Sequence, residues 1–379
     1  MTVISSSFVL VFLLLASLCC AAPATNPKAT TISIVASKPT SSLQSAVPKA
    51  AASSQSAVPK PAASSQPAAK APPALLSQAT ADEAGGGVPS GPLPATSFTP
   101  NAVQLFKVAN FIENIESAFF AQVLQSLGKD QNFNAPATDG RSIANVTSQI
   151  AAQELVHIAT VGGLLGAAGE QAVPACANVV GVTDTNDFLA RSNVITSASI
   201  GVIIGLISTL AMSDPTLVRP LASILSTESQ QDTFFRMSGN NTPSAAPFNT
   251  GLSTTFAYNI ALTFVDPRSC PQLMPLPILP SLNLTSPMMT ATAPVTPPTS
   301  ITFNATEVPR DGNLYVGWVN QANPVVYTNV TLKNGVGSAD VPKGLTGITF
   351  AALTAQMTEI TVDGLSNVTL AGPAAVLLS

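Results

Sequence analysis

Charged residues are scarce in this chain. Asp, Glu, Lys and Arg make up 9% of its 379 residues, against about 25% in an ordinary soluble domain. The formal net charge of −4 comes from 15 basic and 19 acidic residues. The chain therefore offers no basic surface for a phosphate backbone, and we expect no nucleic-acid partner.

Histidine is almost absent, since His157 is the single one. A histidine-dependent triad would have to use this residue in the middle of an apolar helix, a poor position from which to present a nucleophile. The sequence also lacks a Gly-x-Ser-x-Gly elbow, a P-loop, a dinucleotide-binding fingerprint and a Cys-x-x-Cys pair. We therefore predict no catalytic residue.

Cysteine is rare, with four residues in the chain, and the positions of these cysteines indicate whether the protein is secreted. Residues 8–22 form an apolar run ending in small residues, which is typical of a secretory signal peptide spanning residues 1–22. The preceding MTVISSS has no Lys or Arg, so an uncleaved anchor is the alternative. Cleavage would leave Cys176 and Cys270, which an oxidising compartment would join in one disulfide. We expect a secreted protein, extracellular or in the cell wall.

Hydroxyl residues and proline replace the missing charges. Residues 23–98 are rich in Ala, Pro and Ser, and SSLQSAVPKAA returns as SSQSAVPKPAA. Such a segment has too few apolar residues to offset the entropy of folding, which predicts a disordered, O-glycosylated stalk. Six Asn-x-Ser/Thr sequons predict N-glycosylation; they begin at Asn145, Asn240, Asn283, Asn304, Asn329 and Asn367.

Apolar periodicity and capping residues predict helices over residues 99–128, 142–169, 187–213 and 215–239, with a shorter one over 252–265. Four long helices joined by modest loops favour a four-helix bundle within residues 99–284. Residues 192–213 carry no charge and are long enough to span a bilayer. Their Ser, Thr and Gly content favours a buried bundle helix instead, so we expect no stable membrane span.

Three of these helices carry polar groups at a spacing of three, which places each pair on one helical face. Burying such groups in a bundle is costly unless they share a cation or protons. Glu113 or Glu116, with Glu154 and His157, would suit one iron, manganese or zinc ion. The alternative is a buried hydrogen-bonded network of Glu154, His157 and Glu116. The full candidate set is Glu113, Glu116, Glu154, His157, Glu228 and Gln231.

The segments NFIENIESAFF, QELVHIATVGGLLG, PAC, STESQQDTFFR and RSCPQLMPLPILPSLNL occur in this order between residues 100 and 284. Together they resemble the secreted ferritin-like proteins of fungi, the stress-response and late-sexual-development group, which are similar to desiccation-related plant proteins. VPKGLTGITFAALT and LAGPAAVLLS near the C-terminus also resemble that fungal group. The resemblance implies a secreted ferritin-like fold whose biochemical activity is poorly defined.

The chain departs from the ferritin-like ligand pattern, which takes a Glu from each of two helices and Glu-x-x-His from the other two. Its second motif is Glu228-x-x-Gln231, and its third long helix offers only Ser197 and Ser199. We therefore expect a degenerate metal site in a non-enzymatic extracellular protein. The alternative is a metal-binding protein or oxidoreductase with one iron or manganese ion.

The C-terminal residues change to strand-like alternation. Residues 300–379 predict six or seven short strands in a small β-sandwich, separated from the bundle by a Pro- and Thr-rich linker over residues 285–299. Asn334-Gly335 is a hairpin signal. Tyr315 and Trp318 could form a binding patch, but burial in the core is favoured. An adhesin that binds wall glycan through residues 295–379 is a further possibility.

Overall fold

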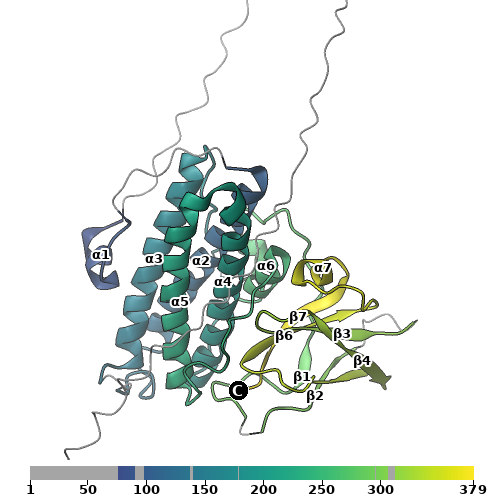
Figure 1. Ribbon diagram of the computed structural model, residues 1–379. Helices are drawn as coiled ribbons and strands as arrows, with labels where there is room; N and C mark the ends of the chain where they lie inside the picture. Colours follow the sequence, from purple (N-terminus) through teal and green to yellow (C-terminus); the bar gives the residue numbers. More distant parts are fainter. Residues whose placement is uncertain (1–75, 90–97, 137–139, 178, 295, 306–311) are drawn as a thin grey trace, which may run out of the picture. The chain divides into compact units, whose positions relative to one another are not determined.

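The computed structural model describes residues 76–89, 98–136, 140–177, 179–294, 296–305 and 312–379. The expected signal peptide and the Ala/Pro/Ser-rich repeats lie outside these residues. The described chain is helical in its first part and forms a β-sheet in its second (Figure 1). This order confirms the predicted fold class.

In the described residues six α-helices precede the strands, and their ends follow the capping residues. Thr99 accepts a hydrogen bond from the amide of Ala102 at the start of α2, and Pro100 occupies the first turn, where its missing N–H has no helical partner to lose. Ser142 and Asp184 cap α3 and α4 in the same way. The helices are α1 (Gln78–Ala84), α2 (Pro100–Ser126), α3 (Ile143–Ala167), α4 (Thr185–Ser213), α5 (Val218–Ser238) and α6 (Thr254–Leu262), with 3-10 turns η1 (Pro215–Leu217) and η2 (Pro267–Ser269).

Helices α2 to α5 form the predicted bundle. α2 packs on α3, α4 packs on α5, and α2 also contacts α4. One end of the bundle is filled by aromatic rings from three helices. The Phe120 ring lies 5.5 Å from that of Phe235, and the Phe119 ring lies 5.9 Å from that of Phe188. Such pairs add about 0.5–1.5 kcal/mol each beyond their burial, so this cluster helps to set the helix register.

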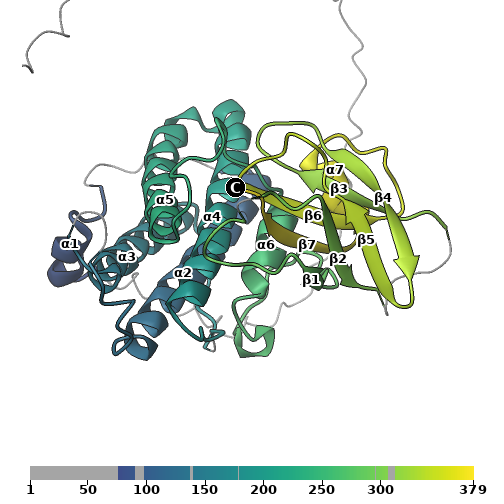
Figure 2. The same ribbon diagram turned by 90° about the horizontal axis from the view of Figure 1, so that it is seen from below.

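Helix α4 contains the uncharged segment 192–213, which is long enough to span a bilayer. Among the described residues, α3 and α4 are both long and apolar enough to cross a membrane by length and composition. In the structure α4 contacts α2, α5 and α6, as a core helix does. α6 in turn contacts α2 and α4 on one side and the last strand on the other (Figure 2).

Helix α1 falls inside the segment expected to be disordered. The Ser77 hydroxyl accepts from the amide of Thr80, and Gly85 ends the helix in the left-handed region at φ 82°. The helix packs on α3, and its last carbonyl, that of Ala84, accepts a hydrogen bond from Gln153 Nε2 at 3.4 Å. The caps of α1 and its packing on α3 therefore order residues 78–84, for which the composition predicts disorder. The prediction of disorder is wrong for this helix.

The predicted disulfide is confirmed. Cys176 and Cys270 are bonded, 94 residues apart in sequence. The bond ties the segment after α3 to the end of η2. It therefore closes a loop that contains α4, α5 and α6.

The strands form one antiparallel sheet in the order β1-β2-β5-β4-β3-β6-β7. β4 pairs with β3 through its first half and with β5 through its second half, so it joins two halves of the sheet. The strands are β1 (Leu284–Ser286), β2 (Ser300–Asn304), β3 (Tyr315–Val319), β4 (Val326–Lys333), β5 (Val336–Asp340), β6 (Ile348–Thr354) and β7 (Thr369–Leu377), with helix α7 (Val362–Asn367) before β7.

The turn between β4 and β5 is the predicted hairpin. Asn334 and Gly335 have φ values of 52° and 79°, as the two central residues of a tight hairpin turn require. The strand β1 begins the sheet at Leu284, so part of the expected linker is already paired with β2.

The two halves of the sheet enclose a core of their own. Phe303 from β2, Trp318 from β3 and Leu353 from β6 belong to this one cluster. Trp318 is 1% exposed, and its Nε1 donates to Thr328 Oγ1 at 2.8 Å. This confirms the core interpretation of Trp318 and leaves no binding face on its ring.

Candidate metal centre

The bundle interior holds five ionisable side chains from three helices. Glu113 and Glu116 lie in α2, Glu154 and His157 in α3, and Glu228 in α5. Glu113 and Glu116 lie on the same face of α2, and Glu154 and His157 lie on the same face of α3, because residues i and i+3 are neighbours on a helix. Their relative exposures are 2%, 0%, 0%, 7% and 0% in that order. All five are therefore removed from solvent.

Four of the five converge on one point. Ligand atoms of Glu113, Glu154, His157 and Glu228 all lie within 4.8 Å of one another. His157 Nδ1 lies 3.1 Å from Glu154 Oε2, 3.1 Å from Glu228 Oε1 and 3.4 Å from Glu113 Oε2. The structure thus adds Glu228 to the set predicted for a single ion, and it takes Glu113 rather than Glu116.

Gln231 occupies the position at which a second histidine would be expected. It does not join the converging group but forms a hydrogen bond with Glu154, which does. Its Nε2 donates to Glu154 Oε1 at 2.7 Å and to Gln153 Oε1 at 3.2 Å. Gln153 in turn donates to the carbonyl of Ala84 in α1. A chain of amides therefore runs from α1 to Glu154 and fixes the orientation of that carboxylate.

The electrostatics separate Glu154 and His157 from the other acids. Burial raises the pKa of Glu154, but His157 and the hydrogen bonds outweigh it, so the net pKa is lowered. Burial lowers the pKa of His157, but Glu154 and Glu113 hold it well above its usual range. Burial, with repulsion from neighbouring carboxylates, raises the pKa of Glu113, Glu116 and Glu228 well above the usual range. The surroundings therefore favour the charged forms of Glu154 and His157, while burial disfavours ionisation of the other three carboxyl groups.

A hydrogen-bonded network accounts for only part of this group. Glu154 and His157 are hydrogen-bonded to each other at 3.1 Å. Both carboxyl oxygens of Glu116, and Oε2 of Glu228, are buried without a hydrogen-bond partner among the described residues. Glu228 Oε1 and Glu113 Oε2 have only a contact with the His157 nitrogen that Glu154 shares. An unpartnered buried polar atom costs about 1–3 kcal/mol. The network expected to include Glu116 is therefore not formed by hydrogen bonds in this part of the chain.

Helix α4 supplies no carboxylate to the group. Ser199 lies beside Glu116 and acts to lower its pKa, while Ser197 lines a different space between α4 and α5. Three carboxylates and one imidazole fit one divalent ion by donor type. They do not supply the symmetric ligand set of a two-iron site, because one helix brings serines and another an amide in place of imidazole.

Some of this site was visible in the sequence and some was not. Every member of the converging group had been singled out by its spacing in a helix. Asp232, four residues after Glu228, stays outside the converging group and lines a polar cavity with Ser197. The low charge of the chain was the available signal, because a carboxylate in so uncharged a protein stands out.

Comparison with known protein families agrees with the bundle and its buried acids. Residues 101–240 match the family model of the ferritin-like domain. A search of curated proteins finds no match to the chain. The matched range runs from the first turn of α2 to just beyond α5, so it contains all five ionisable residues. Residues 101–240 of this chain therefore form a ferritin-like domain with a buried Glu/Glu/His/Glu group that could bind a metal.

Proposed function

We propose that this chain is a secreted glycoprotein whose ferritin-like domain binds one divalent metal ion, iron or manganese, in a non-enzymatic role. Glu113, Glu154, His157 and Glu228 would hold the ion. Carboxylate and imidazole donors together suit these metals. A bound ion would supply positive charge to carboxylates that otherwise repel one another in the bundle interior.

The observation that carries this proposal is the set of carboxylate oxygens that lie around His157 without enough hydrogen-bond donors. Glu228 Oε1 and Glu113 Oε2 lie 3.1 and 3.4 Å from the same His157 nitrogen, which also contacts Glu154 and cannot satisfy all three carboxylates. Glu228 Oε2 has no hydrogen-bond partner among the described residues. Buried polar atoms in folded proteins are nearly always satisfied, and exceptions call for an ion, a proton or a ligand. One divalent ion would serve several of these oxygens at once.

The non-enzymatic part rests on the incomplete second half of the ligand set. Gln231 donates its amide to Glu154 and α4 brings Ser197 and Ser199. A pair of metal ions, which the ferritin-like pattern requires, would lack about half of its protein ligands. This favours a structural or scavenging ion over redox turnover in an extracellular or cell-wall protein of stress or development.

Secretion is supported by two features of the described residues. The Cys176–Cys270 disulfide is compatible with an oxidising compartment. The asparagines of all six sequons are exposed in the structure, so each can carry a glycan without disturbing the core. They are Asn145, Asn240, Asn283, Asn304, Asn329 and Asn367.

The test is metal stoichiometry by elemental analysis after incubation with Fe(II) or Mn(II) and removal of free metal. We expect one ion per chain in the unmodified protein and none in Glu228→Gln. Glu116→Gln is the matched control, because Glu116 is equally buried but lies outside the converging group, and it should keep its ion. An unmodified protein without metal, or equal metal in both variants, refutes the proposed site.

The same proteins test the non-enzymatic role. Binding stabilises the folded state by about 2.7 kcal/mol when free metal is one hundred times its dissociation constant. For a domain of this size that raises the melting temperature by about 5–10 °C. We expect this rise without Fe(II) oxidation above the rate of the Glu228→Gln variant. Faster oxidation by the unmodified protein would instead establish an oxidoreductase.

A further inference from the structure

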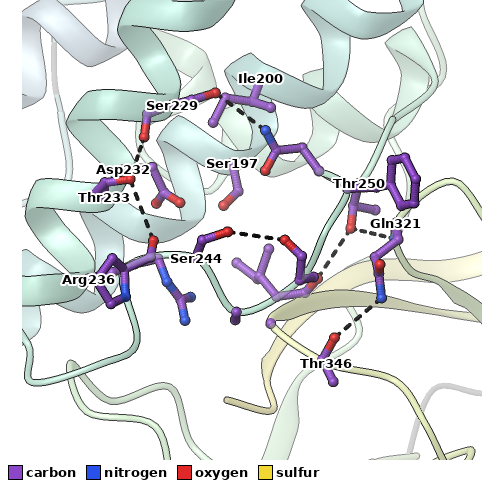
Figure 3. A pocket seen from close by; sticks show the side chains of 17 residues that line it. Ser197, Ile200, Ser229, Asp232, Thr233, Arg236, Ser244, Thr250, Gln321 and Thr346 are labelled. Atoms are coloured by element: carbon purple, nitrogen blue, oxygen red, sulfur yellow. Dashed lines mark hydrogen bonds between the residues drawn. The ribbon is translucent and has the colours of Figure 1, made fainter. Parts of the chain in front are cut away.

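A polar cavity, here called the Asp232 cavity, lies between α4, α5, the segment 243–250 and residues next to β6 (Figure 3). Its volume is about 140 Å³. Since one water-sized group needs about 10–15 Å³ of such volume, the cavity has room for about ten non-hydrogen atoms. That is close to the size of one sugar residue.

Asp232 presents an open acceptor to this cavity. Its side chain as a whole is partly exposed. Its Oδ1 atom is buried without a hydrogen-bond partner among the described residues, so the carboxylate would meet a ligand through its other oxygen. Arg236, one turn further along α5, donates through Nε to the carbonyl of Thr242 at 2.8 Å and through Nη2 to that of Ser379 at 2.7 Å. The guanidinium is therefore held by the backbone, and Asp232 is left to receive a donor from a ligand.

Hydroxyl groups surround the carboxylate. Ser197 and Asp232 point into the same space in Figure 3. The Thr233 hydroxyl donates to the carbonyl of Ser229 at 2.8 Å, which leaves its oxygen lone pairs free to accept. A hydroxyl that is both donor and acceptor suits a ligand that is itself rich in hydroxyls.

The wall opposite α5 is held rigid by hydrogen bonds. Thr250 Oγ1 accepts from the amide of Gln321 at 2.8 Å and lies 3.4 Å from the carbonyl of Ile348, to which it donates. Gln321 Nε2 donates to Thr346 Oγ1 at 3.3 Å (Figure 3). A preformed wall lowers the ordering entropy that a ligand must overcome.

An exposed aromatic ring completes the lining. Phe248 lines the cavity and is 62% exposed, although large apolar side chains are usually buried. A lining that contains a flat apolar ring, a carboxylate and several hydroxyls matches a ligand with both C–H faces and hydroxyl edges. Such a combination of an apolar surface with a few placed polar groups is typical of small-molecule sites.

We infer that the Asp232 cavity binds one sugar residue, either a free monosaccharide or the end of a glycan. The two charges of the lining, on Asp232 and Arg236, have opposite signs, which favours a neutral ligand over an ion. Asp232 accepts from the hydroxyls of the sugar, the hydroxyls of Ser197 and Thr233 face its edge, and Phe248 covers one face of its ring.

The test is saturation-transfer NMR on the full chain with glucose, mannose and N-acetylglucosamine as separate probes. A ligand of about twelve atoms at modest efficiency has a dissociation constant of about 1–10 mM. We expect at least one probe to bind in that range. Glu-to-Gln changes at the metal centre should leave this binding unchanged, because the two sites share no lining residue.

Two variants and one control assign the binding to the cavity. Asp232→Asn removes an ionisable acceptor and should weaken binding about tenfold or more. Phe248→Ala changes an exposed side chain, so it should keep the fold while weakening binding. Asp340→Asn alters an exposed acid at the end of β5 and should bind as the unmodified protein does.

Either of two results would overturn the inference. One is that no probe binds the folded protein at about 50 mM, which is about five to fifty times the expected constant. The other is that Asp232→Asn and Phe248→Ala both bind unchanged. Oligosaccharides of the bound sugar then identify the source. Tighter binding of the oligosaccharide supports a glycan end, and equal binding supports a free monosaccharide.

Discussion

Asp232 offers the sharpest test of the energetics of this fold. Burial raises the pKa of its carboxyl from 3.8 to about 7, and the attraction of Arg236 offsets only part of that rise. The folded state therefore holds the proton more tightly than the unfolded chain between about pH 4 and pH 7. In that window the unfolded state binds fewer protons, so the free energy of unfolding falls as the pH rises.

The size of this effect follows from the shift. About three pKa units at 1.36 kcal/mol each give about 4 kcal/mol above pH 7 as an upper limit. The side chain is partly exposed, and screening by water lowers the expected value to about 2 kcal/mol. Asparagine has the same shape and cannot ionise, so Asp232→Asn should remove this loss of stability.

Urea unfolding followed by circular dichroism between pH 4 and pH 8 measures the difference. We expect Asp232→Asn to match the unmodified protein near pH 4 and to exceed it by about 2 kcal/mol near pH 8. Asp340→Asn should run parallel to the unmodified protein at every pH. If Asp232→Asn is instead the less stable protein at pH 8, then Asp232 forms a favourable ion pair with Arg236 and the reasoning is wrong.

Three further changes have expected outcomes. Replacing both Cys176 and Cys270 by Ser should lower the free energy of unfolding by about 4 kcal/mol in the chain-entropy model, measured by urea unfolding against the oxidised protein. A Cβ added by Gly337→Ala would overlap the Phe303 ring, which is fully buried, so we expect a loss of about 1–3 kcal/mol; an unchanged melting temperature would contradict this packing. Gln153→Ala should leave Glu154 less well oriented and weaken metal binding, whereas a variant with unchanged affinity would show that the amide chain from α1 is dispensable.

Local signals in the sequence were sufficient for the four bundle helices and the hairpin. Thr99-Pro100 marked the start of α2 and Asn334-Gly335 the β4–β5 turn, because capping and turn conformations depend on a few adjacent residues. The same kind of signal failed at α1. Its order depends on docking against α3, a contact between residues about seventy positions apart.

The sequence by itself determined which residues could form a metal site. Glu113, Glu154, His157 and Glu228 share faces with their partners at a spacing of three, and helix geometry makes that arrangement unavoidable. Only the tertiary structure decided that Glu113 rather than Glu116 joins Glu154 and His157, and that Glu228 is added to them. The choice depends on the axial offset and rotation of packed helices, which local spacing does not encode. The Asp232 cavity likewise required the fold. Its walls come from α5, the segment after it and the sheet. These segments are far apart in the sequence and come together only when the chain has packed into its folded core.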